Sequence, residues 1–355
     1  MKKLVMLIAS VIILMSCSED TNPSNSVNKD GSIFLFNGLG DVGTLSVVDN
    51  DGIITNDVMN VGKWPNHIIE DGGTLYVVNS GNNNIQMINA SNNENIGSIE
   101  LSAFSNPMRS VICNGKVYAT NSFGAGIDVY SFDKDSLKTI PVTNVPDSCI
   151  NGGTDAIVSY GDYVYVGVKN VTYDASWNAV YGFESIVVIN SLTDEIVASA
   201  EIGYNISDMI IDTENELHIL CAGNRNDVNG LVKVYSADDI TKQNPDEIIL
   251  GSQPSRLVMN SEGMIYVGIA GLNLDWSGFG GIMKYNSNTN EVLNGSNDLL
   301  YTSTESGIMD LAIDGYDKLY APLFDKNELI IFENDSIDIV LTTGTGPQGL
   351  VFVKE

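Results

Sequence analysis

The feature that most constrains the fold is a short motif that occurs seven times along the 355-residue chain. Each copy pairs an apolar residue with an aromatic one, and histidine replaces the aromatic residue once. The copies are Ile33-Phe34, Leu75-Tyr76, Val117-Tyr118, Val164-Tyr165, Leu217-His218, Ile265-Tyr266 and Leu319-Tyr320. A second apolar segment follows each copy and recurs in step with it. Two markers with the same order and count indicate seven structural repeats.

The repeat from Trp64 to Leu101 indicates what one unit folds into. It contains four short apolar segments separated by turns rich in Asp, Asn and Gly, such as Asp71-Gly72-Gly73. Such segments predict four strands in one antiparallel sheet. Successive units lie 42 to 54 residues apart, close to the length of a four-stranded propeller blade. The sequence therefore predicts an all-β fold, a seven-bladed β-propeller.

The two ends of the repeat array complement each other. The segment from Pro347 to Val353 has the pattern of a first strand, and the segment from Ser32 to Phe36 has the pattern of a second strand. We expect the C-terminal first strand to complete the N-terminal blade. This pairing would close the ring and remove an exposed sheet edge.

The repeat resembles that of the YVTN-repeat propellers, a group within the quinoprotein amine dehydrogenase β-chain-like superfamily. The segments Gly73 to Asn79 and Asn82 to Asn89 carry the resemblance most closely, and it extends over about residues 32–353. His218 and Pro322 depart from the pattern. The resemblance implies the fold and says little about activity, because propellers of this kind include structural, binding and catalytic proteins.

Residues 1–16 have the form of an export signal. Lys2 and Lys3 precede an apolar run that is too short to span a bilayer permanently. The run ends at Leu14-Met15-Ser16-Cys17, which resembles a bacterial lipobox. That resemblance implies cleavage before Cys17 and lipidation of Cys17, and several acyl chains give a stable membrane anchor. The alternative is an ordinary secretory signal in which the cysteine is incidental.

The rest of the chain divides into a tether and one domain. Residues 17–31 are polar and lack apolar periodicity, which predicts a flexible tether. Residues 32–355 are expected to form the propeller as a monomer. We expect the lipid anchor to hold it at the outer membrane, facing the cell surface or, alternatively, the periplasm.

Charge and cysteine content narrow the possible partners. After signal removal, 15 basic and 45 acidic residues give a net charge of 15 − 45 = −30. Such a negative field disfavours nucleic acid as a partner.

After signal removal, the chain keeps Cys113, Cys149 and Cys221, which lack the paired spacing of a zinc or haem site. At most one disulfide could form among these three cysteines. We expect Cys113 and Cys221 instead to be buried free thiols.

Aromatic residues gather in segments predicted to surround the mouth of the central channel. In a propeller, loops that precede first strands and loops that join second to third strands share one face. Two such loops, about residues 168–184 and 269–280, are unusually long. We expect an aromatic ligand-binding wall there, with the alternative that these side chains cover the small cores of the loops themselves. The wall would comprise Trp64, Tyr173, Trp177, Trp276 and Phe279.

Alignment of the first strands predicts a polar ring inside the channel. The aligned position, two residues after the strand start, holds His67, Arg109, Ala156, Asp208, Arg256, Asp310 and Gly349. A guanidinium suits a carboxylate, amide or phosphate group on a ligand. The five polar members, His67, Arg109, Asp208, Arg256 and Asp310, are therefore candidate ligand contacts. The alternative is that Arg and Asp only pair with one another as channel lining.

No motif points to an enzyme. The chain lacks a Gly-rich phosphate loop, a Ser-centred elbow and HExxH, and it has only two histidines. We expect no catalytic residue, metal or cofactor. A metal-dependent propeller lactonase or lyase is an alternative, to which Asp208 and Asp310 could contribute ligands. The two arginines in the same ring oppose a cation there.

The expected function is capture of a ligand outside the cytoplasm. Some cobalamin-capturing surface lipoproteins are similar propellers, so an amphiphilic small molecule such as a corrinoid is one candidate and a glycan is another. An outer-membrane transporter is a candidate partner. The remaining alternative is a protein–protein interaction scaffold within an envelope complex.

Overall fold

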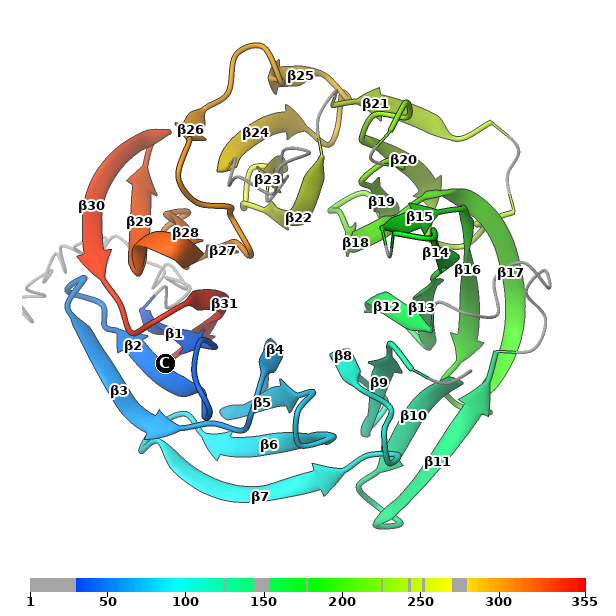
Figure 1. Ribbon diagram of the computed structural model, residues 1–355, viewed down its shortest axis with the longest axis horizontal. Helices are drawn as coiled ribbons and strands as arrows, with labels where there is room; N and C mark the ends of the chain where they lie inside the picture. The colour runs from blue at the N-terminus through cyan, green and yellow to red at the C-terminus, as the bar shows by residue number, and fades with distance from the viewer. Residues whose placement is uncertain are drawn as a thin grey trace, which may run out of the picture.

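The computed structural model describes residues 30–123, 126–142, 153–176, 178–224, 226–241, 244–250, 253–269 and 280–355. Seven antiparallel sheets of four or five strands are arranged as blades around a central axis, and one further sheet is a two-stranded hairpin (Figure 1). The predicted seven-bladed β-propeller is therefore confirmed. Within the described residues, the 3-10 turn η2 (Phe324–Lys326) is the only helical segment, and no helix there is long and apolar enough to span a membrane.

The blades follow one another around the ring, and each runs from an inner first strand to an outer fourth strand. Blade 1 comprises β31 (Pro347–Lys354), β1 (Gly31–Asn37), β2 (Thr44–Val48) and β3 (Ile54–Asn60). Blade 2 comprises β4 (Pro65–Asp71), β5 (Thr74–Asn79), β6 (Asn84–Asn89) and β7 (Glu94–Glu100). Blade 3 comprises β8 (Pro107–Cys113), β9 (Lys116–Asn121), β10 (Gly126–Ser131) and β11 (Ser136–Pro141).

The second half of the ring has the same strand order, and one extra strand, β26, pairs with β24 of blade 6. Blade 4 comprises β12 (Thr154–Tyr160), β13 (Tyr163–Val168), β16 (Phe183–Asn190) and β17 (Glu195–Tyr204). Blade 5 comprises β18 (Ile206–Ile211), β19 (Glu216–Cys221), β20 (Leu231–Ser236) and β21 (Asp246–Ile249). Blade 6 comprises β22 (Pro254–Met259), β23 (Met264–Ile269), β24 (Gly280–Asn286), β25 (Val292–Asn294) and β26 (Tyr301–Ser303). Blade 7 comprises β27 (Ala312–Ile313), β28 (Leu319–Leu323), β29 (Glu328–Glu333) and β30 (Ser336–Thr342).

The ring closes through blade 1 as predicted. β31 pairs antiparallel with β1 from Gly31 opposite Lys354 to Asn37 opposite Pro347. In Figure 1 the dark red β31 lies beside the blue β1. The first strand of this blade therefore comes from the C-terminus, and ladder hydrogen bonds join the two ends of the described chain.

The motif pair marks the second strand because that strand is buried on both of its sides. β5 is buried from Leu75 to Asn79, and β9 is buried from Val117 to Asn121. Neighbouring blades supply the packing, as where Phe36 and Val61 of the blade 1 segment join Leu75 in one apolar cluster. A strand covered on both sides is apolar at nearly every position, so the motif recurs without alternation.

Antiparallel pairing gives the propeller two unlike faces. Pro65 at the start of β4 lies opposite Asn79 at the end of β5, so loops before first strands and loops after second strands share one face, which we name the loop face. The other face carries the remaining turns and both ends of the described chain, where the Glu355 amide donates to the Asp30 carbonyl at 3.0 Å. We name it the terminal face.

The first of the two long predicted loops contains its own hairpin. β14 (Val171–Tyr173) pairs with β15 (Ala179–Tyr181) between β13 and β16 of blade 4. Beside it, the Phe183 ring packs edge-on against Tyr204 at 5.2 Å. Part of the aromatic content of this loop thus packs locally. The second long loop lies almost entirely at residues 270–279, outside the described residues.

Candidate ligand-binding face

Trp64 is the most unusual residue on the loop face. It directly precedes β4, its side chain is 54% exposed, and its backbone φ is +51°. A left-handed backbone costs an ordinary L-residue about 1–2 kcal/mol. The same position is left-handed in four other blades, where it is Asn106, Gly153, Asn205 and Gly346. Asn and Gly tolerate this conformation, so blade 2 places a bulky aromatic residue where these blades place small ones.

Other loops of the same face also carry exposed apolar side chains. Phe104 in the β7–β8 loop is 88% exposed and also left-handed, with φ +60°. Phe123 in the β9–β10 loop is 64% exposed, and the β1–β2 loop exposes Leu39 and Val42. Several exposed apolar side chains on the loops of one face favour an interaction site there. We name this set the apolar crown: Leu39, Val42, Trp64, Phe104 and Phe123.

Hydrogen bonds hold the loops of the crown to one another. The Gly81 amide donates to the Lys63 carbonyl at 2.9 Å, and the Phe123 amide donates to the Ser105 carbonyl at 2.9 Å. The Asn83 side chain links blades 2 and 3, because its Oδ1 accepts from the Asn106 amide at 3.1 Å. The crown therefore stands on connected backbone, which lowers the entropy lost when a ligand binds.

Inside the channel, Arg109 is the centre of a charged network. Its Nη1 lies 2.6 Å from Asp208 Oδ1, and its Nε lies 3.2 Å from Asp155 Oδ1. Arg109 belongs to blade 3, Asp155 to blade 4 and Asp208 to blade 5, so one guanidinium joins three blades. A second pair in the ring, Arg256 Nε with Asp310 Oδ1, is longer at 3.5 Å.

Three ring side chains also bind the backbone of the next blade. His67 Nδ1 accepts from the Ser110 amide at 3.3 Å. Asp208 and Asp310 act in the same way: Asp208 Oδ2 accepts from the Leu257 amide at 2.8 Å, and Asp310 Oδ2 accepts from the Leu350 amide at 3.3 Å. The three acceptors stand at the aligned position of their blades, so the ring connects first strands around the channel.

Burial and charge shift the pKa values of this ring. Burial, together with Arg109, lowers the pKa of His67 well below 6.5, so His67 is neutral. Burial also lowers the pKa of Arg256, with Arg109 adding to the effect. Burial raises the pKa of Asp310 to about 6 despite the opposing charge of Arg256. Asp155 differs, because Lys169 and Arg109 outweigh its burial and lower its pKa.

Blade 4 contributes charged residues that the strand alignment missed. The alignment chose Ala156, whereas Asp155, one residue earlier, joins the network. Lys169 Nζ lies 3.5 Å from Asp155 Oδ2 and donates to the Ile206 carbonyl at 2.8 Å. Glu184 is fully buried, accepts from the Ile206 amide at 2.6 Å, and has a pKa raised by burial. These contacts fasten blade 4 to blade 5.

Several predicted residues fall outside the described part of the chain. These are Cys17, Trp177, Trp276 and Phe279, and for Tyr173 only the backbone is described. Their predicted roles stay predictions. The described cysteines, Cys113 and Cys221, are buried free thiols as expected.

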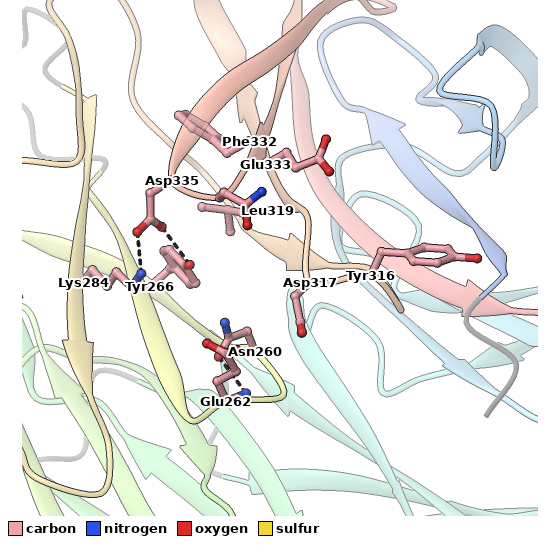
Figure 2. A pocket seen from close by; sticks show the side chains of 11 residues that line it. Asn260, Glu262, Tyr266, Lys284, Tyr316, Asp317, Leu319, Phe332, Glu333 and Asp335 are labelled. Atoms are coloured by element: carbon pink, nitrogen blue, oxygen red, sulfur yellow. Dashed lines mark hydrogen bonds and ion pairs between the residues drawn. The ribbon is translucent and has the colours of Figure 1, made fainter. Parts of the chain in front are cut away.

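The terminal face has a polar cavity of about 340 Å³ between blades 6 and 7 (Figure 2). Its principal cation, Lys284, is paired with Asp335 at 2.6 Å, and the same carboxylate accepts from the Tyr266 hydroxyl at 3.0 Å. Asp317 in its wall accepts from Ser261. The charges of Lys284, Asp335 and Asp317 are therefore engaged within the protein, and we assign no ligand to this cavity.

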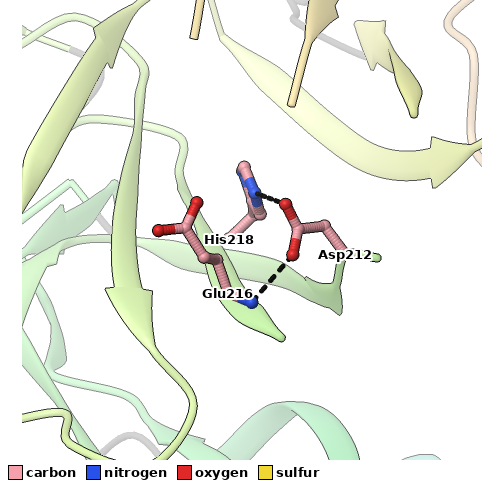
Figure 3. A group of neighbouring side chains, drawn as sticks. All are labelled: Asp212, Glu216 and His218. Atoms are coloured by element: carbon pink, nitrogen blue, oxygen red, sulfur yellow. Dashed lines mark hydrogen bonds and ion pairs between the residues drawn. The ribbon is translucent and has the colours of Figure 1, made fainter. Parts of the chain in front are cut away.

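Three potential metal ligands lie close together at the β18–β19 turn of blade 5 (Figure 3). They are Asp212, Glu216 and His218. Asp212 Oδ1 accepts from the Glu216 amide at 2.7 Å, and Asp212 Oδ2 lies 3.3 Å from His218 Nε2. The other ring nitrogen of His218 bonds the Tyr285 hydroxyl at 3.0 Å.

Blade 7 repeats this turn without a histidine. Asp314 accepts from the Lys318 amide at 2.9 Å and from the Tyr320 hydroxyl at 3.0 Å. His218 stands in the place of Tyr320, so its contact with Asp212 is the contact by which the repeat closes this turn. We assign the cluster to the fold.

Comparison with known proteins supports the fold. No protein-family model and no curated protein sequence matches the chain. A hydrazine synthase of Kuenenia stuttgartiensis matches with TM-score 0.62 and 14% identity over 82% of this chain and 95% of that chain. Virginiamycin B lyase of Staphylococcus aureus gives 0.60 and 13% over 82% and 91%. A quinonprotein alcohol dehydrogenase-like protein of Bacteroides thetaiotaomicron gives 0.62 and 14% over 91% and 78%. At such identities the similarity shows the propeller fold alone.

Proposed function

We propose that this protein is a lipid-anchored envelope protein of the YVTN-repeat type that captures an organic ligand outside the cytoplasm on its loop face. The ligand is an amphiphilic small molecule, such as a corrinoid, or a glycan. The observation that carries the proposal is Trp64, an exposed indole held on a left-handed backbone on a face whose other loops also expose apolar side chains.

The energetic cost of this arrangement favours a binding role. Strained backbone persists where the surrounding structure enforces it, and such positions cluster at binding and active sites. Folding gains little from Trp64, because more than half of its surface stays in water. A partner that covers the ring would recover the hydrophobic free energy that folding leaves unused, at about 25 cal/mol per Å².

The positions of the chain ends suit this role. The described chain begins at Asp30 on the terminal face, opposite the crown. If Cys17 is lipidated, the connecting segment attaches to the face that lies away from the crown. The loop face is then free to meet soluble ligands rather than the membrane that holds the anchor. We place that anchor in the outer membrane.

The enzyme alternative receives less support from the channel. A metal-dependent lactonase or lyase would need carboxylate oxygens that point at a cation. Asp208 already binds Arg109 and the Leu257 amide, and Asp310 already binds the Leu350 amide. These acceptors serve the fold, and the two arginines add positive charge beside them.

A protein-interaction scaffold is the second candidate. The observation that favours it is Phe104, whose ring is 88% exposed and so stands clear of any pocket. A protruding aromatic side chain is a common anchor at protein interfaces.

Ligand screening against matched variants tests the proposal. Thermal shift and tryptophan fluorescence would be recorded with cyanocobalamin, neutral oligosaccharides and calcium. We expect an organic ligand to raise the melting temperature of the native protein but not of Trp64→Ala. Leu192→Ala is the control, because Leu192 is an apolar residue on the terminal face with more than half of its side chain exposed. A response to calcium alone would support the enzyme, and no response to any probe would support the scaffold.

A further inference from the structure

We infer that the ligand of the apolar crown is an uncharged saccharide chain, lying across blades 1 to 3. This inference rests on the proposed function and specifies its ligand class. It comes from the charge of the crown loops, from their side-chain amides and from the openness of the surface.

The crown loops are uncharged overall in a strongly acidic protein. They comprise residues 38–43, 61–64, 80–83, 101–106 and 122–123. These segments contain one acid, Asp41, and one base, Lys63, whereas the whole chain carries a net charge of −28. An anionic or cationic ligand would need complementary charge at its site. The crown therefore suits a neutral ligand.

Two side-chain amides of the β5–β6 turn are held by hydrogen bonds to the loops that carry the aromatic residues. Asn82 Oδ1 accepts from the Lys63 amide at 2.5 Å, next to Trp64. Asn83 Oδ1 accepts from the Asn106 amide at 3.1 Å, next to the loop of Phe104. Because each oxygen is engaged, each NH2 group is directed away from that bond, and within the described residues neither NH2 has a hydrogen-bond acceptor. Oriented free donors match ligand hydroxyl groups.

The aromatic rings supply the complementary apolar contact. A sugar ring presents C–H groups on one face and hydroxyls at its edge, so it can stack on an indole or phenyl ring while its edge meets amide donors. The Lys63 ammonium lies 4.6 Å from the centre of the Trp64 ring and helps to hold the ring in place. The high exposure of Phe104 and Phe123 indicates an open surface, which fits an extended chain better than a small molecule that must be enclosed.

A glycan array with fluorescently labelled protein tests this inference. The array would carry neutral and acidic glycans, and cyanocobalamin binding would be measured in parallel. We expect binding to neutral chains, at least tenfold weaker binding for Trp64→Ala, and several-fold weaker binding for Phe104→Ala. Phe132→Ala is the aromatic control, because Phe132 is exposed on the terminal face, and its affinity should stay within twofold of the native value.

The other outcomes separate this inference from the proposed function. Cyanocobalamin binding that depends on Trp64, with no glycan bound, would overturn the saccharide class and keep the binding face. Binding only to acidic glycans would also overturn it. Neutral glycan binding that is unchanged in Trp64→Ala and Phe104→Ala would overturn both the saccharide site and the proposed binding face.

Discussion

Replacing Arg109 with methionine should destabilise the propeller by about 3 kcal/mol. Methionine keeps most of the side-chain volume but leaves Asp208 and Asp155 without their shared guanidinium. Their side chains are only 11% and 19% exposed, and breaking a buried pair in this way costs about 3–5 kcal/mol. The lower end applies because Asp155 keeps Lys169 at 3.5 Å and Asp208 keeps the Leu257 amide.

This loss is large enough to measure by urea unfolding and by melting temperature. An unfolding entropy of roughly 2.1 cal/mol/K per residue, over about 325 residues, is about 0.7 kcal/mol/K. The expected 3 kcal/mol then lowers the melting temperature by about 4 °C. Lys138→Met is the control, because Lys138 pairs with Asp194 at 2.6 Å but is half exposed, and it should cost at most about 1 kcal/mol. An equally small cost for Arg109→Met would refute the interpretation of the ring as a buried network that joins blades.

Three further predictions concern single residues. The carboxyl of Asp310 should titrate near pH 6 when followed by NMR, because folding raises its pKa from 3.8. Its contribution to stability is therefore greatest below pH 3.8 and is lost as the pH rises through about 6. A titration midpoint near 4 would contradict the burial of this group. Trp64→Asn should change the free energy of unfolding by no more than about 1 kcal/mol, because relief of backbone strain offsets the lost partial burial of the ring; a loss above about 3 kcal/mol in urea unfolding would identify Trp64 as a core residue. The thiol of Cys221 should resist iodoacetamide in the native protein at pH 8, because burial raises its pKa to about 12; rapid labelling detected by mass spectrometry would show that the strand opens.

The sequence allowed the blade count and the ring closure to be predicted because both depend on short-range patterns. Leu75-Tyr76 and its counterparts recur since each second strand meets the same two-sided packing. Closure followed from the complementary halves of one blade, and β31 pairs with β1 as expected.

The site was predicted less completely, for physical reasons. Blades 3 and 4 have the same register shift at the start of their first strands, so Ala156 is the true counterpart of Arg109. Asp155 reaches Arg109 from one residue earlier, a position that the alignment did not include. Phe104 lies in a short loop of ordinary length, and its significance comes from a backbone angle that sequence does not show. Lys169 reaches the ring from the end of a second strand, a position that the alignment of first strands did not include.

The account depends most directly on whether the crown binds a ligand through Trp64. The decisive measurement is the affinity of the native protein and of Trp64→Asn for whichever probe, cyanocobalamin or a neutral oligosaccharide, raises the native melting temperature. Asparagine is chosen because blades 3 and 5 already use it at this left-handed position. We predict at least tenfold weaker binding, with a free energy of unfolding in urea that changes by no more than about 1 kcal/mol. Equal affinity in the two proteins would contradict the proposed binding face.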